Sequence, residues 1–232
     1  MRVAVIRFPG SNCEAETYRA IQQSGGEAIY LSYREASLRG AEAVILPGGF
    51  SYGDYLRSGA IARFSPVMDA IRAHADSGGP VLGVCNGFQI LCEAGLLPGA
   101  LVRNATLRYL SRPVTVRIER NDTPFTADFE EGETFTVPIG HGDGRYVATD
   151  EELERLEQNG QVVLRYTGTG SADLAANPNG SVRDIAGICN RDRNVVGMMP
   201  HPERIPDPIQ GACAGMRVFS SLVHSLASRG VS

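Results

Sequence analysis

The sequence predicts an α/β protein with a largely parallel sheet, helices on both faces of that sheet, and an antiparallel elaboration in its second half. The first hundred residues alternate apolar strands with helical patterns, and those strands lack polar alternation. Such strands are buried on both faces, which is typical of a parallel sheet covered by helices. After residue 100 the pattern changes, because the stretch 112–119 alternates polar and apolar residues, as a half-exposed strand does.

Strands and helices alternate regularly through residues 1–100. We predict strands at 3–8, 28–31, 43–46 and 80–84, and helices at 14–24, at 66–75 and from residue 86 onward. Pro47 and the two glycines after it end the third strand. Ligands of such sheets bind beyond the carboxyl ends of the strands, so residues at those ends are the first candidates for a functional site.

The second half adds strands with fewer helices. We predict strands at 112–119, 134–138, 162–166, 185–189 and 195–199, and helices at 151–158 and 216–227. The last two strands are expected to return to the core sheet. Because no internal repeat, linker or low-complexity tract interrupts the chain, we predict a single domain over residues 1–232.

Composition excludes several classes of function. The chain has 232 residues and a formal net charge of −4, which gives no basic field for nucleic acid or an anionic membrane. No apolar run approaches the roughly 20 residues that span a bilayer, and the first strand is too short for a signal peptide. We therefore expect a cytoplasmic protein with neither nucleic acid nor membrane as a partner.

The five cysteines are an odd number and include no C-x-x-C pair; they stand at positions 13, 85, 92, 189 and 213. A disulfide framework is not expected in an intracellular chain of this size. A structural zinc site would need closely paired ligands, so no metal is expected either.

The stretch 81–91 has the sequence form of a nucleophile elbow centred on Cys85. A short apolar strand ends in the cysteine, Gly83 and Gly87 flank it as G-x-C-x-G, and a helical pattern follows. The unpaired N–H groups at the helix start stabilise a thiolate, and the turn is expected to expose the sulfur. The alternative is an inert cysteine at the end of a buried core strand.

A thiolate nucleophile needs a base, and His201 is the first candidate. It lies just past the strand 195–199, again at a strand end, and Glu203 follows two residues later. We expect the flanking Pro200 and Pro202 to prevent a helix, so that Glu203, in extended geometry, accepts the imidazole N–H. The alternative is a proline-stiffened turn in which His201 is solvated.

His141 is the rival base, in the glycine-rich segment 140–146. Its three glycines favour either close approach of the backbone to a ligand or a mobile loop, with a plain turn as the alternative. The segment 47–54 follows a strand and can present an N–H to a developing oxyanion. A phosphate-binding loop competes with that interpretation, but neither G-x-G-x-x-G nor the Walker pattern is present.

Taken together, these segments resemble the class I, triad-type glutamine amidotransferases. That resemblance is carried by the elbow G-V-C-N-G-F-Q-I-L at 83–91 and the distant H-P-E at 201–203. The resemblance narrows to the glutaminase subunits of phosphoribosylformylglycinamidine synthases on further motifs in the expected order: R-F-P-G-S-N-C-E at 7–14, L-P-G-G-F-S-Y-G-D-Y-L-R at 46–57, H-G-D-G-R-Y at 141–146, N-P-N-G-S at 177–181 and G-M-M-P-H-P-E-R at 197–204.

The resemblance implies the flavodoxin-like fold of the class I amidotransferases and a catalytic triad. Cys85 would be the nucleophile that attacks the glutamine side-chain amide. His201 would be the general base and then the acid, with Glu203 as its orienting partner.

Four further positions match the family's pattern. The backbone N–H groups of Gly49 and Asn86 match the oxyanion-hole positions. Gln89 matches a position near bound glutamine, and His141 falls in the segment that helps to form the glutamine pocket.

The resemblance also implies partners. Glutamine hydrolysis would supply ammonia to a large synthetase subunit, which uses ATP and Mg²⁺ to convert formylglycinamide ribonucleotide to the amidine in purine biosynthesis. A small third subunit is expected in the same complex, and no cofactor is expected in this chain. The alternatives are another Cys-His-Glu amidotransferase, a stand-alone amide hydrolase, or a silent scaffolding subunit, which the presence of all three triad residues disfavours.

Overall fold

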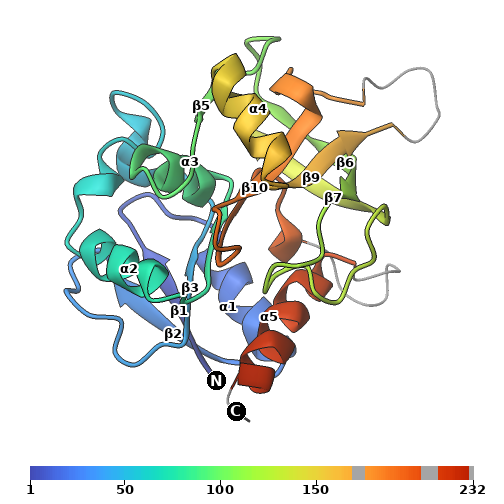
Figure 1. The fold of residues 1–232 in the computed structure, drawn as a ribbon. Helices are drawn as coiled ribbons and strands as arrows, with labels where there is room; N and C mark the ends of the chain where they lie inside the picture. Colours follow the sequence, from blue (N-terminus) through green and yellow to red (C-terminus); the bar gives the residue numbers. More distant parts are fainter. Residues whose placement is uncertain (169–175, 205–213, 230–232) are drawn as a thin grey trace.

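The computed structural model describes residues 1–168, 176–204 and 214–229, and a nine-stranded sheet runs through it (Figure 1). The strands lie in the order β2-β1-β3-β4-β11-β10-β9-β6-β7. The first five strands in this order pair parallel, and the remaining pairs are antiparallel. The predicted fold class is therefore confirmed, and the antiparallel elaboration is a continuation of the parallel sheet.

The parallel half is built from short, apolar strands. They are β2 (Glu27–Ser32), β1 (Arg2–Arg7), β3 (Ala43–Leu46), β4 (Val81–Val84) and β11 (Val195–Met198). Every residue of β3, β4 and β11 is buried, which requires cover on both faces. The sequence predicted each of these strands to within one residue at either end.

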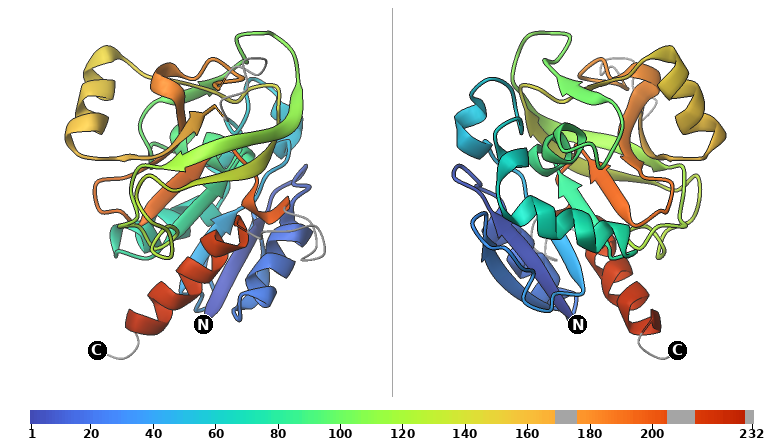
Figure 2. Two further views of the ribbon diagram at one scale, coloured as in Figure 1. Left: turned by 90° about the vertical axis from the view of Figure 1, so that its right-hand side faces the viewer. Right: turned by 60° about the vertical axis from the view of Figure 1, so that its left-hand side comes forward.

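Helices supply that cover (Figures 1 and 2). Helix α1 (Glu14–Gln23) links β1 to β2, and α2 (Val67–Asp76) links β3 to β4. These two connections run in opposite directions along the sheet, so right-handed crossovers put the two helices on opposite faces. Helix α5 (Met216–Arg229) packs beside α1, and α3 (Asn86–Glu93) packs on β4 and β11.

The antiparallel half consists of β10 (Ile185–Cys189), β9 (Val162–Thr167), β6 (Leu110–Ile118) and β7 (Thr134–His141). Helix α4 (Asp150–Gln158) precedes β9 and begins with a capping box between Thr149 and Glu152. Two short strands, β5 (Ala100–Val102) and β8 (Arg145–Val147), pair with each other. The sequence did not predict them, because three residues are too few to show a period.

Single 3₁₀ turns connect several of these elements. The described ones are η1 (Ser51–Asp54), η2 (Ala62–Phe64), η3 (Val182–Asp184) and η4 (Pro202–Arg204). None of the helices in the described parts of the chain is both long enough and apolar enough to cross a membrane.

Helix α3 packs directly on strand backbone. A Cβ atom at Gly87 would lie 2.0 Å from the carbonyl oxygen of Leu46, and one at Gly83 would lie 2.6 Å from the backbone of Gly87. Both distances are far shorter than any tolerated contact, so the two glycines are required by the close approach of helix and strands. This approach allows α3 to begin immediately after β4, with Cys85 at the junction.

We expect Gly87→Ala to lower the free energy of unfolding by about 3 kcal/mol, because the added methyl group overpacks the contact with Leu46. Urea unfolding monitored by circular dichroism measures this change. Gly142→Ala is the matched control, since its Cβ atom would meet only a Tyr109 ring carbon, at 3.8 Å. Equal stability of the two variants would contradict the packing argument.

Candidate active site

Cys85 stands between β4 and α3 in a strained backbone conformation. Its φ of 50° and ψ of −103° are rare for a residue with a side chain. The Cys85 N–H donates to the Met198 carbonyl oxygen at 2.8 Å, and the Cys85 carbonyl oxygen accepts from the Gln89 N–H at 3.1 Å. The conformation is therefore held from both sides, as is typical of functional positions.

The sulfur of Cys85 is buried, not exposed as the sequence suggested. Cys85 is 5% exposed, and its Sγ lies 3.8 Å from the Gly140 carbonyl oxygen. The prediction failed because β7, expected to end at residue 138, runs on to His141 and covers the elbow. Gly140 and His141 therefore belong to a strand, and the glycine-rich turn is confined to residues 142–144.

His201 and Glu203 form a buried pair. His201 Nδ1 lies 2.7 Å from Glu203 Oε1, and their side chains are 1% and 0% exposed. The backbone N–H of His201 donates to the Pro138 carbonyl oxygen at 2.9 Å, which attaches the backbone of the base to β7. The two residues do come together, but by way of the turn η4 and not the predicted extended backbone. Pro202 begins that turn, a position where its fixed φ and missing N–H are both tolerated.

The parallel pairing of β4 with β11 brings His201 to the elbow. Val84 is paired with Met198 at the ends of the two strands, so Cys85 and His201 follow the same edge of the sheet. Burial alone would lower the pKa of His201, but the Glu203 carboxylate and the sulfurs of Cys85 and Cys13 raise it well above its usual 6.5. The imidazolium form of His201 is therefore favoured, and Cys85 is close enough to interact with its charge.

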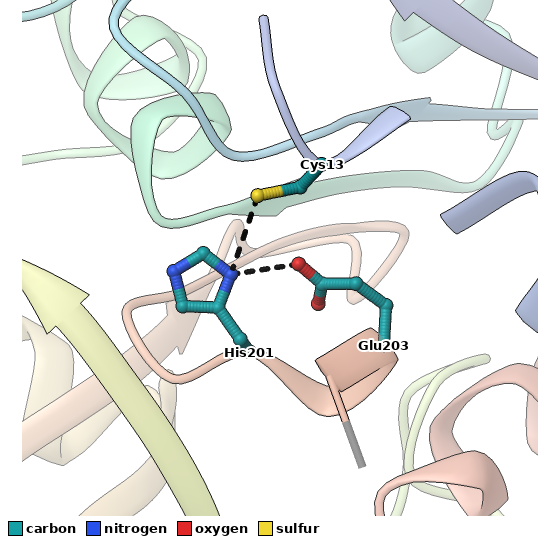
Figure 3. Close-up of side chains that lie close together, drawn as sticks. All are labelled: Cys13, His201 and Glu203. Atoms are coloured by element: carbon teal, nitrogen blue, oxygen red, sulfur yellow. Dashed lines mark hydrogen bonds and ion pairs between the residues drawn. The ribbon is translucent and has the colours of Figure 1, made fainter. Parts of the chain in front are cut away.

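Cys13 is the neighbour of the triad that sequence reasoning did not single out. Its Sγ lies 3.9 Å from His201 Nδ1 (Figure 3). The same sulfur accepts from Arg204 Nη2 at 2.9 Å. The ring of His201 occupies the space left by Gly48, where a Cβ atom would lie 2.7 Å from Cε1. One signal could have found Cys13: like Cys85 and His201, it follows a strand of the parallel sheet at its carboxyl end.

The two predicted oxyanion positions follow the neighbouring strands β3 and β4. Asn86 is the first residue of α3, so its N–H has no acceptor within the helix. Gly49 forms a bridge with Ser11 in which the hydrogen bonds run through neighbouring residues: the Phe50 N–H donates to Gly10 and the Asn12 N–H to Gly48. The Gly49 N–H is thus not used by the bridge. Its role as an oxyanion donor, like that of Asn86, stays a prediction.

Gln89 connects the elbow helix to the segment after β7. Its Oε1 accepts from Asn86 Nδ2 at 2.8 Å, and its Nε2 donates to the Asp143 carbonyl oxygen at 2.7 Å. Asn86 Oδ1 in turn accepts from the Ser51 N–H at 3.1 Å. These bonds tie three chain segments around Cys85. The predicted contact of Gln89 with glutamine is not tested by them.

Asn104, also missed by sequence reasoning, fixes the tautomer of His141. Asn104 Nδ2 donates to the carbonyl oxygens of Arg108 and His141, so Oδ1 is the acceptor on the other side of the amide. Oδ1 accepts from the Gly144 N–H and lies 3.0 Å from His141 Nδ1. Nδ1 therefore carries the proton of a neutral ring, and Nε2 carries the lone pair.

His141 is neutral in this environment. Burial, with a smaller contribution from the charge of His201, lowers its pKa to about 4. Its Nε2 is buried and has no hydrogen-bond partner among the described residues. His141 is thus a buried acceptor next to the triad, suited to bind a ligand N–H group and poorly suited to hold a proton.

Comparisons with known proteins show the family of the chain. The sequence profile of the CobB/CobQ-like glutamine amidotransferase domain matches residues 1–221. The phosphoribosylformylglycinamidine synthase subunit PurQ of Rubrobacter xylanophilus is 55% identical over 223 residues, covering 96% of this chain and 98% of that protein. The chain belongs to the PurQ subunit family.

Further relatives of this family support the assignment. PurQ of Koribacter versatilis is 50% identical over 231 residues and matches 99% of this chain and 100% of that protein. A chain of the solved structure of PurLQS from Thermotoga maritima superposes with a TM-score of 0.86 at 42% identity, covering 97% of this chain and 98% of that chain. The family expected from the sequence motifs is therefore confirmed, and with it the class I glutamine amidotransferase fold.

The low pKa of His141 predicts a pH dependence of stability. Between pH 6.5 and about 4, the unfolded chain binds a proton at His141 and the folded chain does not. Wild-type stability should therefore fall as the pH is lowered through this window, by up to roughly 3 kcal/mol from this residue. His141→Gln removes the contribution, so its stability, measured by urea unfolding across the window, should decline less steeply. Equal slopes would show that the ring is protonated in the fold.

Proposed function

We propose that this chain is the glutaminase subunit of a phosphoribosylformylglycinamidine synthase, working in the cytoplasm as one amidotransferase domain over residues 1–232. The observation that carries the proposal is the buried Cys85, His201 and Glu203 arrangement in a member of this family. The chain hydrolyses glutamine to glutamate and supplies ammonia to a synthetase subunit.

Acylation begins at Cys85. The Cys85 thiolate attacks the side-chain amide carbon of glutamine. His201 carries a proton on Nε2, which is directed at the leaving nitrogen. Glu203 stabilises the imidazolium through Nδ1. When the tetrahedral intermediate collapses, the carbon–nitrogen bond breaks, His201 gives its proton to the nitrogen, and ammonia leaves behind a glutamyl thioester.

Hydrolysis of the thioester uses the same groups in reverse. His201 Nε2, now without its proton, takes one from a water molecule, which attacks the thioester carbonyl and releases glutamate and the Cys85 thiolate. In the described residues Nε2 has no hydrogen-bond partner, so it is available for these transfers. The N–H groups of Gly49 and Asn86 would stabilise the oxyanion in both half-reactions.

The destination of the ammonia follows from the family. The relatives are named as synthase subunits, and one solved structure is that of PurLQS. We infer a large synthetase subunit and a small third subunit as partners. The large subunit would use ATP and Mg²⁺ to convert formylglycinamide ribonucleotide to the amidine, while this chain needs no cofactor of its own.

The test is a comparison of two nitrogen sources. We expect Cys85→Ala in the assembled complex to reduce glutamine-dependent amidine formation by about 10⁴-fold, while ammonium salts still support the reaction because they bypass the glutaminase. Cys92→Ser, which removes another thiol of the α3 region, is the control and should keep the glutamine-dependent rate. Full glutamine use by Cys85→Ala would refute the nucleophile. Failure of wild type with glutamine while ammonium works would refute the pathway.

Four exposed apolar side chains on two loops suit contact with the synthetase partner. Tyr55, Leu56, Phe64 and Leu107 are 75%, 90%, 73% and 74% exposed. We call these four side chains the docking surface. They stand on two loops, residues 55–64 and 103–109, and exposed apolar side chains of this size are typical of protein interfaces.

The docking surface is linked to the catalytic segment. Ser58 Oγ donates to Asp143 Oδ2 at 3.2 Å, and Arg103 lies 3.8 Å from the same carboxylate, so the two exposed loops meet next to His141. Leu56 also has a φ of 69°, a costly conformation for leucine, and its side chain is too exposed for packing against the described residues to offset that cost. Contact with the partner at Leu56 would stabilise that conformation and couple docking to the site.

We expect Leu56→Ser to weaken binding to the synthetase subunit at least about tenfold, because one buried apolar anchor of an interface is worth on the order of 1–2 kcal/mol. Titration calorimetry or a concentration series of glutamine-dependent activity measures it. Tyr30→Ser is the control, since Tyr30 is 41% exposed on the edge strand β2. Unchanged affinity for Leu56→Ser would place the interface elsewhere.

A further inference from the structure

The triad shares two of its members with a second cluster. One Sγ from Cys13, one ring nitrogen of His201 and one carboxylate oxygen of Glu203 all lie within 4.8 Å of one another, and all three residues are buried (Figure 3). The cluster brings together the loop after β1 and the turn after β11. Nothing in glutamine hydrolysis as derived above uses Cys13.

The ligand types in this cluster are those of zinc. We propose that Cys13, His201 and Glu203 bind Zn²⁺ and that the bound ion blocks glutamine hydrolysis. Sulfur, imidazole nitrogen and carboxylate oxygen are the donors that Zn²⁺ takes, whereas Ca²⁺ and Mg²⁺ take oxygen. Glu203 Oε2 is buried and has no hydrogen-bond partner among the described residues, so the carboxylate has an acceptor to spare.

The spacing needs little adjustment. Bonds of about 2.0–2.3 Å to a tetrahedral ion separate its ligand atoms by roughly 3.5 Å. The observed separations lie on either side of this value, at 3.9 Å from Cys13 Sγ to His201 Nδ1 and 2.7 Å from Nδ1 to Glu203 Oε1. Arg204 Nη2, which donates to the same sulfur at 2.9 Å, would support the ligand as hydrogen bonds around metal sites do.

Binding would remove the base from the catalytic cycle. The ion displaces the Cys13 thiol proton and the proton on His201 Nδ1, and both leave to solvent. The only proton of the ring is then on Nε2, which has no lone pair to accept a proton from Cys85 or from water. The hydrogen bond between Glu203 and the imidazole is also lost. The inhibitory half of the proposal rests on the proposed function, whereas the binding half does not.

Binding is tested on the full chain without an activity assay. Co²⁺ is the probe, because a thiolate ligand gives it a near-ultraviolet charge-transfer band and Zn²⁺ then displaces it. Cys85→Ala should keep the band, since Cys85 is not a ligand, and Cys85→Ala with Cys13→Ser should lose it. Cys92→Ser controls for other thiols. A band that survives in the double variant, or no band in any variant, would overturn the site.

Inhibition is tested on the complex with glutamine as nitrogen source, each variant being compared with its own metal-free rate after preincubation with Zn²⁺. We expect wild type and Cys92→Ser to be inhibited alike, and Cys13→Ser to need on the order of tenfold or more Zn²⁺. Cys13→Ala is the second variant if the serine protein does not fold. Equal sensitivity of both Cys13 variants would place the inhibitory ion on Cys85 and His201 instead. Inactive metal-free wild type would refute the proposed function and leave the Co²⁺ result standing.

Discussion

The contact between α3 and the backbone of β3 and β4 is the constraint on which the site depends. No side chain separates the helix from the strands at Gly87, and the space for a Cβ atom at Gly83 is likewise occupied. The helix can therefore start directly at the end of β4, which forces Cys85 into its unusual backbone conformation. The same junction places Cys85 at the N-terminus of α3, where the N–H groups of the first turn favour negative charge, so geometry and electrostatics have one origin.

The second half of the site depends on a pairing between strands far apart in the sequence. Because β11 runs parallel to β4, the chain leaves both strands at the same edge of the sheet. The buried carboxylate of Glu203 then holds one nitrogen of His201, and the other is left for chemistry. A buried ion pair of this kind contributes little to stability in itself, and its orientation of the ring is the functional gain.

Sequence reasoning succeeded where local pattern decides the structure. The five parallel strands, the elbow and the Cys85, His201 and Glu203 set all follow from apolar runs, glycine spacing and known motifs. It failed where distant segments decide. Burial of the sulfur depends on β7 crossing the elbow, and the place of Cys13 depends on a contact 188 residues away in sequence. Asn104 acts through loop contacts that no periodicity reveals.

That separation of 188 residues has a consequence for the way the protein is made. Cys13 lies in the loop after β1 and His201 in the turn after β11, and β3 and β4 lie between these two strands in the sheet, so all four strands must be paired before the two residues meet. Non-local pairing of this kind forms late in folding. A chain still on the ribosome therefore presents an elbow cysteine without its imidazole. Competence to attack an amide arises only after His201 and Glu203 have been synthesised and folded into place, so shorter nascent chains leave the cell's glutamine intact.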